Sequence, residues 1–119
     1  MPRGRGDNAP NTYVSSGTWP EATLRPDAPV EAHYAQQLAR RLAAAMTERP
    51  ISNRALAKLA GVTHPTIGFI LNGDHHADVS TVARLEVALG ADLYPAGLHQ
   101  HLTTQQRQPS AGNPEPTAS

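Results

Sequence analysis

The chain has 119 residues, enough for one domain, and its eleven prolines and few aromatic residues indicate that part of it lies outside a packed core. It contains no cysteine, which excludes disulfides, thiolate zinc sites and thiol nucleophiles. Ten basic residues balance ten acidic ones, so net charge gives no support to a nucleic-acid partner.

No apolar run is long enough to cross a bilayer, and the Arg-Gly-Pro-rich start lacks the apolar stretch of a secretory signal. We therefore expect a cytoplasmic protein without a membrane partner. Residues 1–27 and 105–119 are rich in glycine and proline and show no apolar periodicity, so we expect a flexible N-terminal arm and a disordered C-terminal tail. The folded domain is expected over residues 28–104.

The first expected helix begins after Asp27 and ends before Pro50. Apolar side chains recur on one of its faces every four residues, at Tyr34, Leu38, Leu42 and Met46. A second helix is expected over residues 53–60, with Ser52 as its N-cap. Its buried side is expected to carry Leu56, Leu59 and Ala60.

A third helix is expected to start just after Thr63 and to run to Leu71, followed by a left-handed exit at Asn72-Gly73. A fourth helix is expected between Ser80 and Gly90, and a short fifth one from about Pro95. Nothing in the sequence indicates a strand. The pattern predicts an all-α fold, a compact bundle of four or five helices.

The turn between the second and third helices carries the motif with the clearest physical meaning. Ala57 is small enough to let two helices approach closely, and Gly61 supplies the positive φ that a tight turn needs. Val62 and Ile67 then anchor the junction in the core. Such a turn leaves the outer face of the third helix protruding, which is the shape that enters a major groove.

Residues 38 to about 95 resemble the Cro/C1-type helix-turn-helix family, which has a lambda-repressor-like bundle. The resemblance is carried by three runs that match together, Ala-Leu-Ala-Lys-Leu-Ala-Gly-Val-Thr, Thr-Ile-Gly-Phe-Ile-Leu-Asn-Gly and Ser-Thr-Val-Ala-Arg-Leu-Glu-Val-Ala-Leu-Gly, and by a following Leu-Tyr-Pro. It implies a transcriptional regulator that binds double-stranded DNA through the third helix.

The resemblance also implies which side chains meet the DNA. Four are directed toward base edges: Thr63, His64, Thr66 and Phe69. Ser52 and Asn53 are directed toward one phosphate, and Asn72, His75 and His76 toward another. Arg54 and Lys58 join the phosphate contacts, since no acidic residue lies between Glu48 and Asp74 and the stretch is locally electropositive.

Two positions on the third helix depart from the family pattern. Gly68 stands where a side chain usually helps to read bases, and Phe69 where a polar or basic one is common. The third helix is therefore expected to make few hydrogen bonds to bases. We expect His64 to donate to a guanine or a phosphate and Phe69 to contact a thymine methyl group. The alternative is that Phe69 belongs to the core and His64 is a solvated residue at the helix start.

The histidine pairs His75-His76 and His99-Gln100-His101 suggest a metal site at first sight. Neither pair has the i, i+4 spacing or the acidic partner of a metal centre, so no metal and no cofactor is expected. Near the start, Pro2-Arg3-Gly4-Arg5-Gly6 resembles the core of an AT-hook but lacks the following proline. Trp19 either docks on the helical domain or covers a partner surface.

Three classes of function remain after these observations. The first is a sequence-specific DNA-binding regulator that acts as a dimer, with symmetry from residues 93–102, from contact on the DNA or from a partner protein. The second is a protein-interaction module, such as an antitoxin or an anti-regulator, that kept the fold and lost base readout. An enzyme is disfavoured, because there is no phosphate-binding loop, no suitably spaced carboxylate pair and no serine nucleophile signature.

If His64, His75 and His76 contact DNA, affinity should rise as the pH falls from 8 to 6, since imidazoles gain positive charge over that range. Titration of a DNA site at several pH values checks this expectation. A flat affinity profile would argue against histidine contacts.

Overall fold

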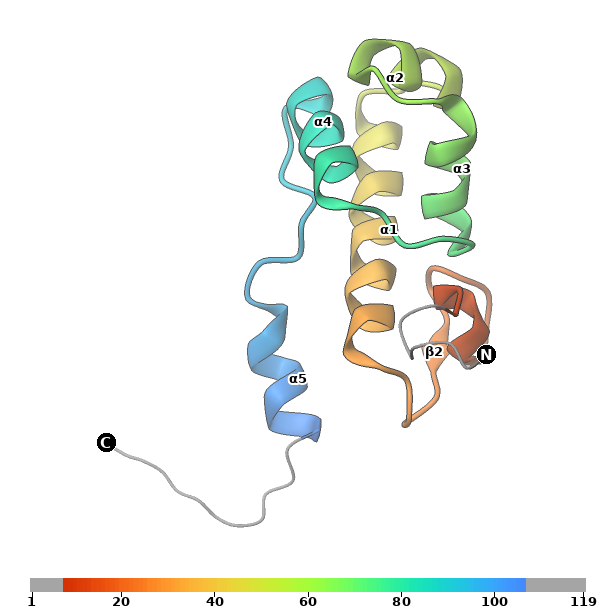
Figure 1. Ribbon diagram of the computed structural model, residues 1–119, viewed down its shortest axis with the longest axis vertical. Helices are drawn as coiled ribbons and strands as arrows, with labels where there is room; N and C mark the ends of the chain where they lie inside the picture. The colour runs from red at the N-terminus through yellow and green to blue at the C-terminus, as the bar shows by residue number, and fades with distance from the viewer. Residues whose placement is uncertain (1–7, 107–119) are drawn as a thin grey trace, which may run out of the picture.

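The computed structural model describes residues 8–106, with side chains described as far as Leu102 (Figure 1). Its helices are α1 (Val30–Glu48), α2 (Asn53–Ala60), α3 (His64–Asn72), α4 (Val79–Leu89) and α5 (Leu98–Gln106). Before them come a short 3-10 helix η2 (Pro10–Tyr13) and the strands β1 (Val14–Ser16) and β2 (Thr23–Leu24). The predicted all-α class with five helices is confirmed, whereas the small hairpin was not expected.

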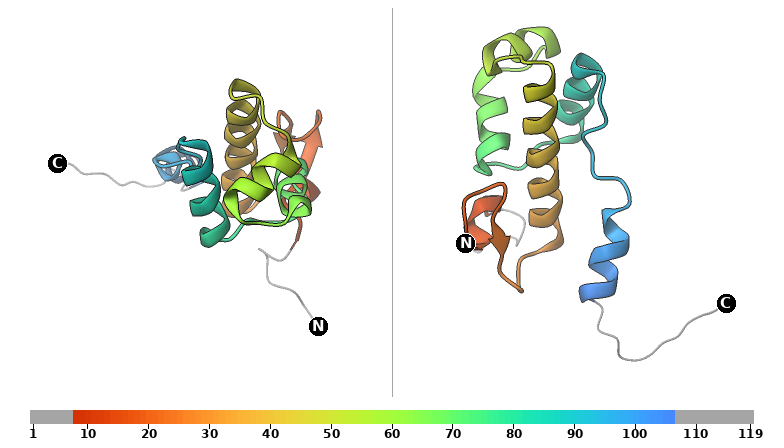
Figure 2. Two further views of the ribbon diagram at one scale, coloured as in Figure 1. Left: turned by 90° about the horizontal axis from the view of Figure 1, so that it is seen from above. Right: turned by 180° about the vertical axis from the view of Figure 1, so that it is seen from behind.

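Helix α1 is the central element, with α3 on one side of it, α4 on the other and α2 across one end (Figures 1 and 2). Five side chains with no exposed surface form the centre of the core, one from each of α1 to α4 and one from the following segment: Leu42, Leu56, Ile67, Leu85 and Leu93. Burial of each such side chain stabilises a fold by about 1.5–3 kcal/mol. Helix α5 extends beyond the bundle (Figure 2).

Most helix boundaries agree with the sequence pattern, and the exceptions have local causes. Helix α4 begins at Val79, because Asp78 caps it by accepting a hydrogen bond from the Thr81 N–H at 2.8 Å. Helix α5 begins at Leu98 and reaches Gln106, so it starts later than Pro95 and runs past residue 104.

Two side chains expected on buried faces are exposed to different degrees. Leu59 is 57% exposed, because the inward face of α2 is formed by Leu56, Ala57 and Ala60. Tyr34 is half-buried, and its ring packs against that of Tyr94 with 5.7 Å between centroids. The burial of Leu59 was therefore a wrong prediction.

Residues 8–27 form a folded N-terminal unit, which differs from the flexible arm expected there. Strands β1 and β2 pair antiparallel, with Val14 opposite Leu24. Tyr13 packs with Ala28 and Ala32 in a small second core. The composition of the segment is loop-like, but the burial of Tyr13 and Pro10 supplies apolar contact that composition alone does not reveal. Residues 1–7 and 107–119, including the AT-hook-like run and most of the predicted tail, lie outside the described residues.

Side chains of α1 attach the N-terminal unit to the bundle. Gln36, a polar side chain that is only 6% exposed, donates from Nε2 to the Pro20 carbonyl at 2.9 Å and also to that of Ala22. Arg40 donates from Nε to the same Pro20 carbonyl at 3.0 Å and lies 3.5 Å from the Glu21 carboxylate. Because a buried amide is costly without partners, these bonds fix the unit against α1.

The segment after α4 is held by the carboxylate of Glu86, whose Oε2 accepts hydrogen bonds from the N–H groups of Leu93 at 2.9 Å and Tyr94 at 3.0 Å. These two bonds, that of Tyr94 being the larger influence, hold the pKa of Glu86 below its ordinary value of 4.5. Hydrogen bonding from Thr81, through its side chain first and its backbone N–H second, lowers the pKa of Asp78 in the same way. Both carboxylates therefore stabilise the fold in their charged form.

Acidification should weaken the fold through these carboxylates. A group whose pKa is lower in the folded chain stabilises it above its unfolded pKa, and that contribution is lost as the pH falls through the folded pKa. We expect the free energy of unfolding in urea to fall from pH 6 to pH 3. In Glu86→Gln, which keeps the acceptor oxygen without the charge, the fall should be smaller. An unchanged pH dependence in Glu86→Gln would show that Glu86 does not contribute to it.

Candidate nucleic-acid interface

Helix α2 begins with a capped N-terminus that faces solvent. Ser52 accepts a hydrogen bond from the Ala55 N–H at 3.1 Å, as predicted for an N-cap. The first-turn amides of a helix have no carbonyl partners within it and carry partial positive charge, so this end suits a phosphate. Arg54 and Lys58 are exposed on the same helix, and Asn53 is half-buried.

The turn after α2 has the predicted conformation. Gly61 adopts φ of +76° and donates to the Ala57 carbonyl at 2.9 Å, and the Val62 N–H donates to the same oxygen at 3.1 Å. A Cβ at Gly61 would lie 3.2 Å from Nη1 of Arg84, so this arginine of α4 reaches over the turn. No sequence pattern places Arg84 here, because its proximity to the turn depends on how α4 packs.

Helix α3 has one buried face and one exposed face. Ile67 and Ile70 point into the core. His64 and Phe69 are exposed, with Phe69 40% exposed, while Thr66 is half-buried. Thr63, at the N-cap position, is exposed and shares a hydrogen bond of 2.7 Å with the Thr66 hydroxyl. The four residues predicted to read bases therefore lie together along the start and outer side of one short helix.

Phe69 and His75 form an aromatic pair at the far end of this face. Their ring centroids are 4.3 Å apart in an edge-to-face arrangement. Such pairs stabilise by about 0.5–1.5 kcal/mol beyond their buried area. His75, predicted to contact a phosphate, therefore also supports Phe69 from the loop that follows α3.

The loop after α3 lies against the N-terminal unit (Figure 1). Gly73 ends the helix with φ of +75°, as predicted. Asn72 and His76 are exposed there, and the Nε2 atom of His76 lies 3.2 Å from the Asn8 carbonyl oxygen. Trp19 packs directly over Gly73, which answers the question left by the sequence: it docks on the helical domain.

The electrostatics of the α2–α3 face come from few groups. Arg54 and Lys58 of α2 are cations on this face, Arg84 of α4 adds a third beside Gly61, and no acidic residue lies between Glu48 and Asp74. Arg49, in the same stretch, donates instead to the Ala88 and Leu89 carbonyls at the end of α4, at 3.1 Å each.

The two histidine pairs lie on different elements, His75 and His76 in the loop after α3 and His99 and His101 on α5. Between residues 8 and 106, no three His, Cys, Asp or Glu side chains gather as metal ligands would. None of the helices in that range has the length and apolar composition of a membrane span.

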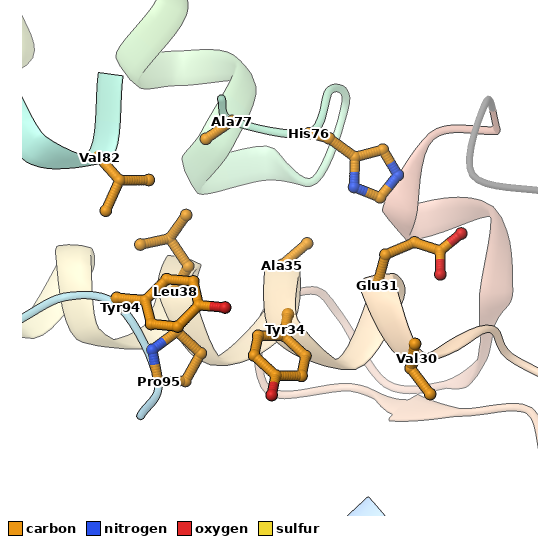
Figure 3. A pocket seen from close by; sticks show the side chains of 10 residues that line it. All are labelled: Val30, Glu31, Tyr34, Ala35, Leu38, His76, Ala77, Val82, Tyr94 and Pro95. Atoms are coloured by element: carbon orange, nitrogen blue, oxygen red, sulfur yellow. The ribbon is translucent and has the colours of Figure 1, made fainter. Parts of the chain in front are cut away.

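An apolar cleft of about 300 Å³ lies between α1, the loop before α4, and the Tyr94-Pro95 segment. Tyr34 lies in its middle, Val82 toward one end, and Glu31 and His76 toward the other (Figure 3). Val30 and Tyr94, 46% and 53% exposed, also line the cleft. The cleft is separate from the outer face of α3.

Two helices joined by a left-handed glycine, the second one short and exposed along its outer side, define a helix-turn-helix protein. This is the architecture of a DNA-binding regulator. The family described as helix-turn-helix domain matches residues 37–96, about half of the chain, and the chain belongs to this family. The matched range agrees with the residues on which the sequence resemblance was based. A search of curated proteins found no match.

The two glycines of the motif should respond oppositely to alanine. Gly61→Ala forces a side chain into the left-handed region and should lower the free energy of unfolding by about 1–2 kcal/mol. Gly68 lies inside α3, where a Cβ would meet only Nδ2 of Asn53 at 3.9 Å, so Gly68→Ala should raise it by about 0.5–1 kcal/mol. Urea unfolding of the two variants checks both predictions. A Gly68→Ala variant less stable than the unaltered protein would contradict the prediction for Gly68.

Proposed function

We propose that this protein is a sequence-specific regulator of transcription that binds double-stranded DNA in the manner of the Cro/C1-type proteins and has no catalytic role. The observation that supports this most directly is the outer side of α3, where residues of the predicted reading set are exposed beyond a turn whose buried side is fixed by Ile67. In this proposal α3 lies in the major groove.

Base readout in this proposal is sparse in hydrogen bonds. His64 at the first position of α3 donates to a guanine or a phosphate, and the Thr63 and Thr66 hydroxyls add polar contacts. Phe69, supported by His75, offers an apolar edge to a thymine methyl group. Gly68 between them contributes no side chain, so specificity rests on few groups.

Phosphate contacts flank the reading helix in this proposal. On one side are the capped N-terminus of α2, with Ser52 and Asn53, and the cations Arg54 and Lys58. On the other side is the loop with Asn72, His75 and His76. Contacts on both sides of a groove fix the orientation of the helix within it.

A dimer is part of the proposal, because a single module of this size makes too few contacts for useful specificity. In residues 93–102, one of the sources of symmetry considered from the sequence, Leu93 and Leu102 are buried within the chain itself, at 0% and 6% exposure. Val30 and Tyr94, beside the apolar cleft, supply exposed apolar surface for a second copy instead. Sedimentation of the protein with and without DNA tests this part.

Selection of bound fragments from random duplex DNA tests the proposal as a whole. A single enriched motif, with two half-sites about one helical turn apart, is the expected result. For that site, His64→Ala and Phe69→Ala should each weaken binding by about tenfold, whereas Val87→Ala, at an 84% exposed position of α4, should not. Unchanged affinity in both variants with the fold intact would refute this assignment of the reading face.

The salt dependence of binding tests the phosphate contacts separately. Each cation that neutralises a phosphate adds about one to the slope of log affinity against log salt. Arg54→Ala and Lys58→Ala should each reduce that slope by roughly this amount. Arg41→Ala is the matched control, because Arg41 lies on α1 and reaches the Tyr94 carbonyl at 3.4 Å, away from α2 and α3. An equal loss of slope in all three variants would show that the charge effect is not local.

The second candidate function is a protein-interaction module, such as an antitoxin or an anti-regulator. It is favoured by one specific observation: Leu59 and Phe69, 57% and 40% exposed, put apolar surface on α2 and α3. An apolar protein interface should respond little to salt, whereas a DNA interface with several phosphate contacts should weaken steeply. Failure of the selection to enrich any duplex would favour this candidate.

A further inference from the structure

We propose that Asn11 and Trp19 are positioning residues for DNA binding, because the N-terminal unit fixes the C-terminal end of α3 and the loop that follows it. This inference rests on the proposed DNA-binding function, which it extends to a part of the chain outside the helix-turn-helix match at residues 37–96. It is carried by three hydrogen bonds from Asn11 to residues 72–74 and by the packing of Trp19 on Gly73.

Asn11 makes the polar part of the attachment. Its backbone N–H donates to the Gly73 carbonyl at 2.9 Å, and its Nδ2 donates to the Asn72 carbonyl at 3.0 Å and to the Asp74 carboxylate at 3.1 Å. The last carbonyls of a helix have no partners within it. Asn11 therefore caps the end of α3 from a distant part of the chain.

Trp19 makes the apolar part. A Cβ on Gly73 would lie 2.6 Å from Cε2 of the indole, so the ring packs on a glycine that no other residue could replace without displacement. The same Gly73 has φ of +75°, which also favours glycine. The indole thus covers the residue at which α3 turns into the loop.

The attachment resists displacement because its other side is bound to α1. The carbonyl of Pro20, next to Trp19, accepts hydrogen bonds from both Gln36 and Arg40 of that helix. The N-terminal unit is therefore held between α1 and the end of α3. A shift of the Trp19-Pro20 segment would break contacts with both helices.

Helix α3 needs this support, because it has nine residues and includes Pro65 and Gly68. Isolated helices of such length are marginal in water. Its buried side chains, Ile67 and Ile70, lie in its middle, and residues 72–76 beyond them include three of the predicted phosphate contacts. Loosening this end therefore acts on Asn72, His75 and His76, which would have to become ordered again when DNA binds.

The experiment compares Asn11→Ala, Trp19→Ala and Trp19→Phe in the full chain, with Thr12→Ala as the control. Thr12 is exposed beside Asn11 in η2. Affinity is measured for the duplex enriched from the random pool. We expect Asn11→Ala and Trp19→Ala to weaken binding by about tenfold, and Thr12→Ala to leave it unchanged.

Trp19→Phe is the conservative rescue. The indole Nε1 is buried and finds no acceptor among the described residues, so its removal leaves no partner unsatisfied. The phenyl ring keeps contact with Gly73. We expect Trp19→Phe to retain affinity within about twofold, because it keeps the contact between an aromatic ring and Gly73.

Amide hydrogen exchange supplies a readout that does not depend on DNA. The amides of Gly73 and Asp74, which donate to the Ile70 and Phe69 carbonyls, should exchange about tenfold faster in Asn11→Ala. Those of Gly61 and Val62, which donate to the Ala57 carbonyl in the turn before α3, should not change. This pattern separates local loosening from a general loss of stability, which would accelerate exchange in both places.

The outcomes are distinct for the two proposals. Unchanged affinity and unchanged exchange in Asn11→Ala overturn the inference about the N-terminal unit, while DNA binding stands. Faster exchange at Gly73 and Asp74 with unchanged affinity also overturns the positioning role.

If the unaltered protein enriches no duplex, the proposed function fails, and the exchange data alone then decide whether the unit supports α3. If Trp19→Ala does not fold, Asn11→Ala and Trp19→Phe carry the comparison.

Discussion

The rest of the structure depends on how one nine-residue helix is held. Helix α3 is anchored by Ile67 and Ile70, and it lies between two glycines in the left-handed conformation, Gly61 in the turn before it and Gly73 at its C-terminal end. At the first end, Gly61 turns the chain so that α2 and α3 share a core with Leu56. At the second, Gly73 turns it under the indole of Trp19. The outer side of α3 is free for recognition because these constraints act on its inner side and its ends.

Local patterns in the sequence predicted the parts of the fold that local chemistry determines. The Ser52 cap, the left-handed Gly61 and Gly73, and the burial of Ile67 follow from residue types within a few positions of one another. Leu59 was predicted to be buried but is exposed. Leu56 and Leu59 are three residues apart in a short helix, so the sequence alone does not decide which of the possible faces is buried. Its exposure is decided by the packing of Leu56, Ala57 and Ala60.

The N-terminal unit was not predictable in the same way, because its stability comes from contacts between residues far apart in the sequence. Asn11 meets Gly73, and Gln36 meets Pro20 and Ala22, pairings that no periodicity reveals. Trp19 was the signal that the sequence did offer, since a large aromatic side chain in a polar segment usually needs a surface to cover, but the sequence left open whether that surface belongs to the helical domain or to a partner. The candidate site is similar: residue types indicated α3, while the support of Phe69 by His75 required the fold.

The contact of Trp19 with Gly73 also bears on the order in which the chain can fold. Bringing these two residues together closes a long loop, and the entropy lost in doing so must be offset by contacts that form with or before it. The contact between the indole and Gly73 can therefore form only after α3 has been translated, whereas the hydrogen bonds of Pro20 and Ala22 with Gln36 need only α1.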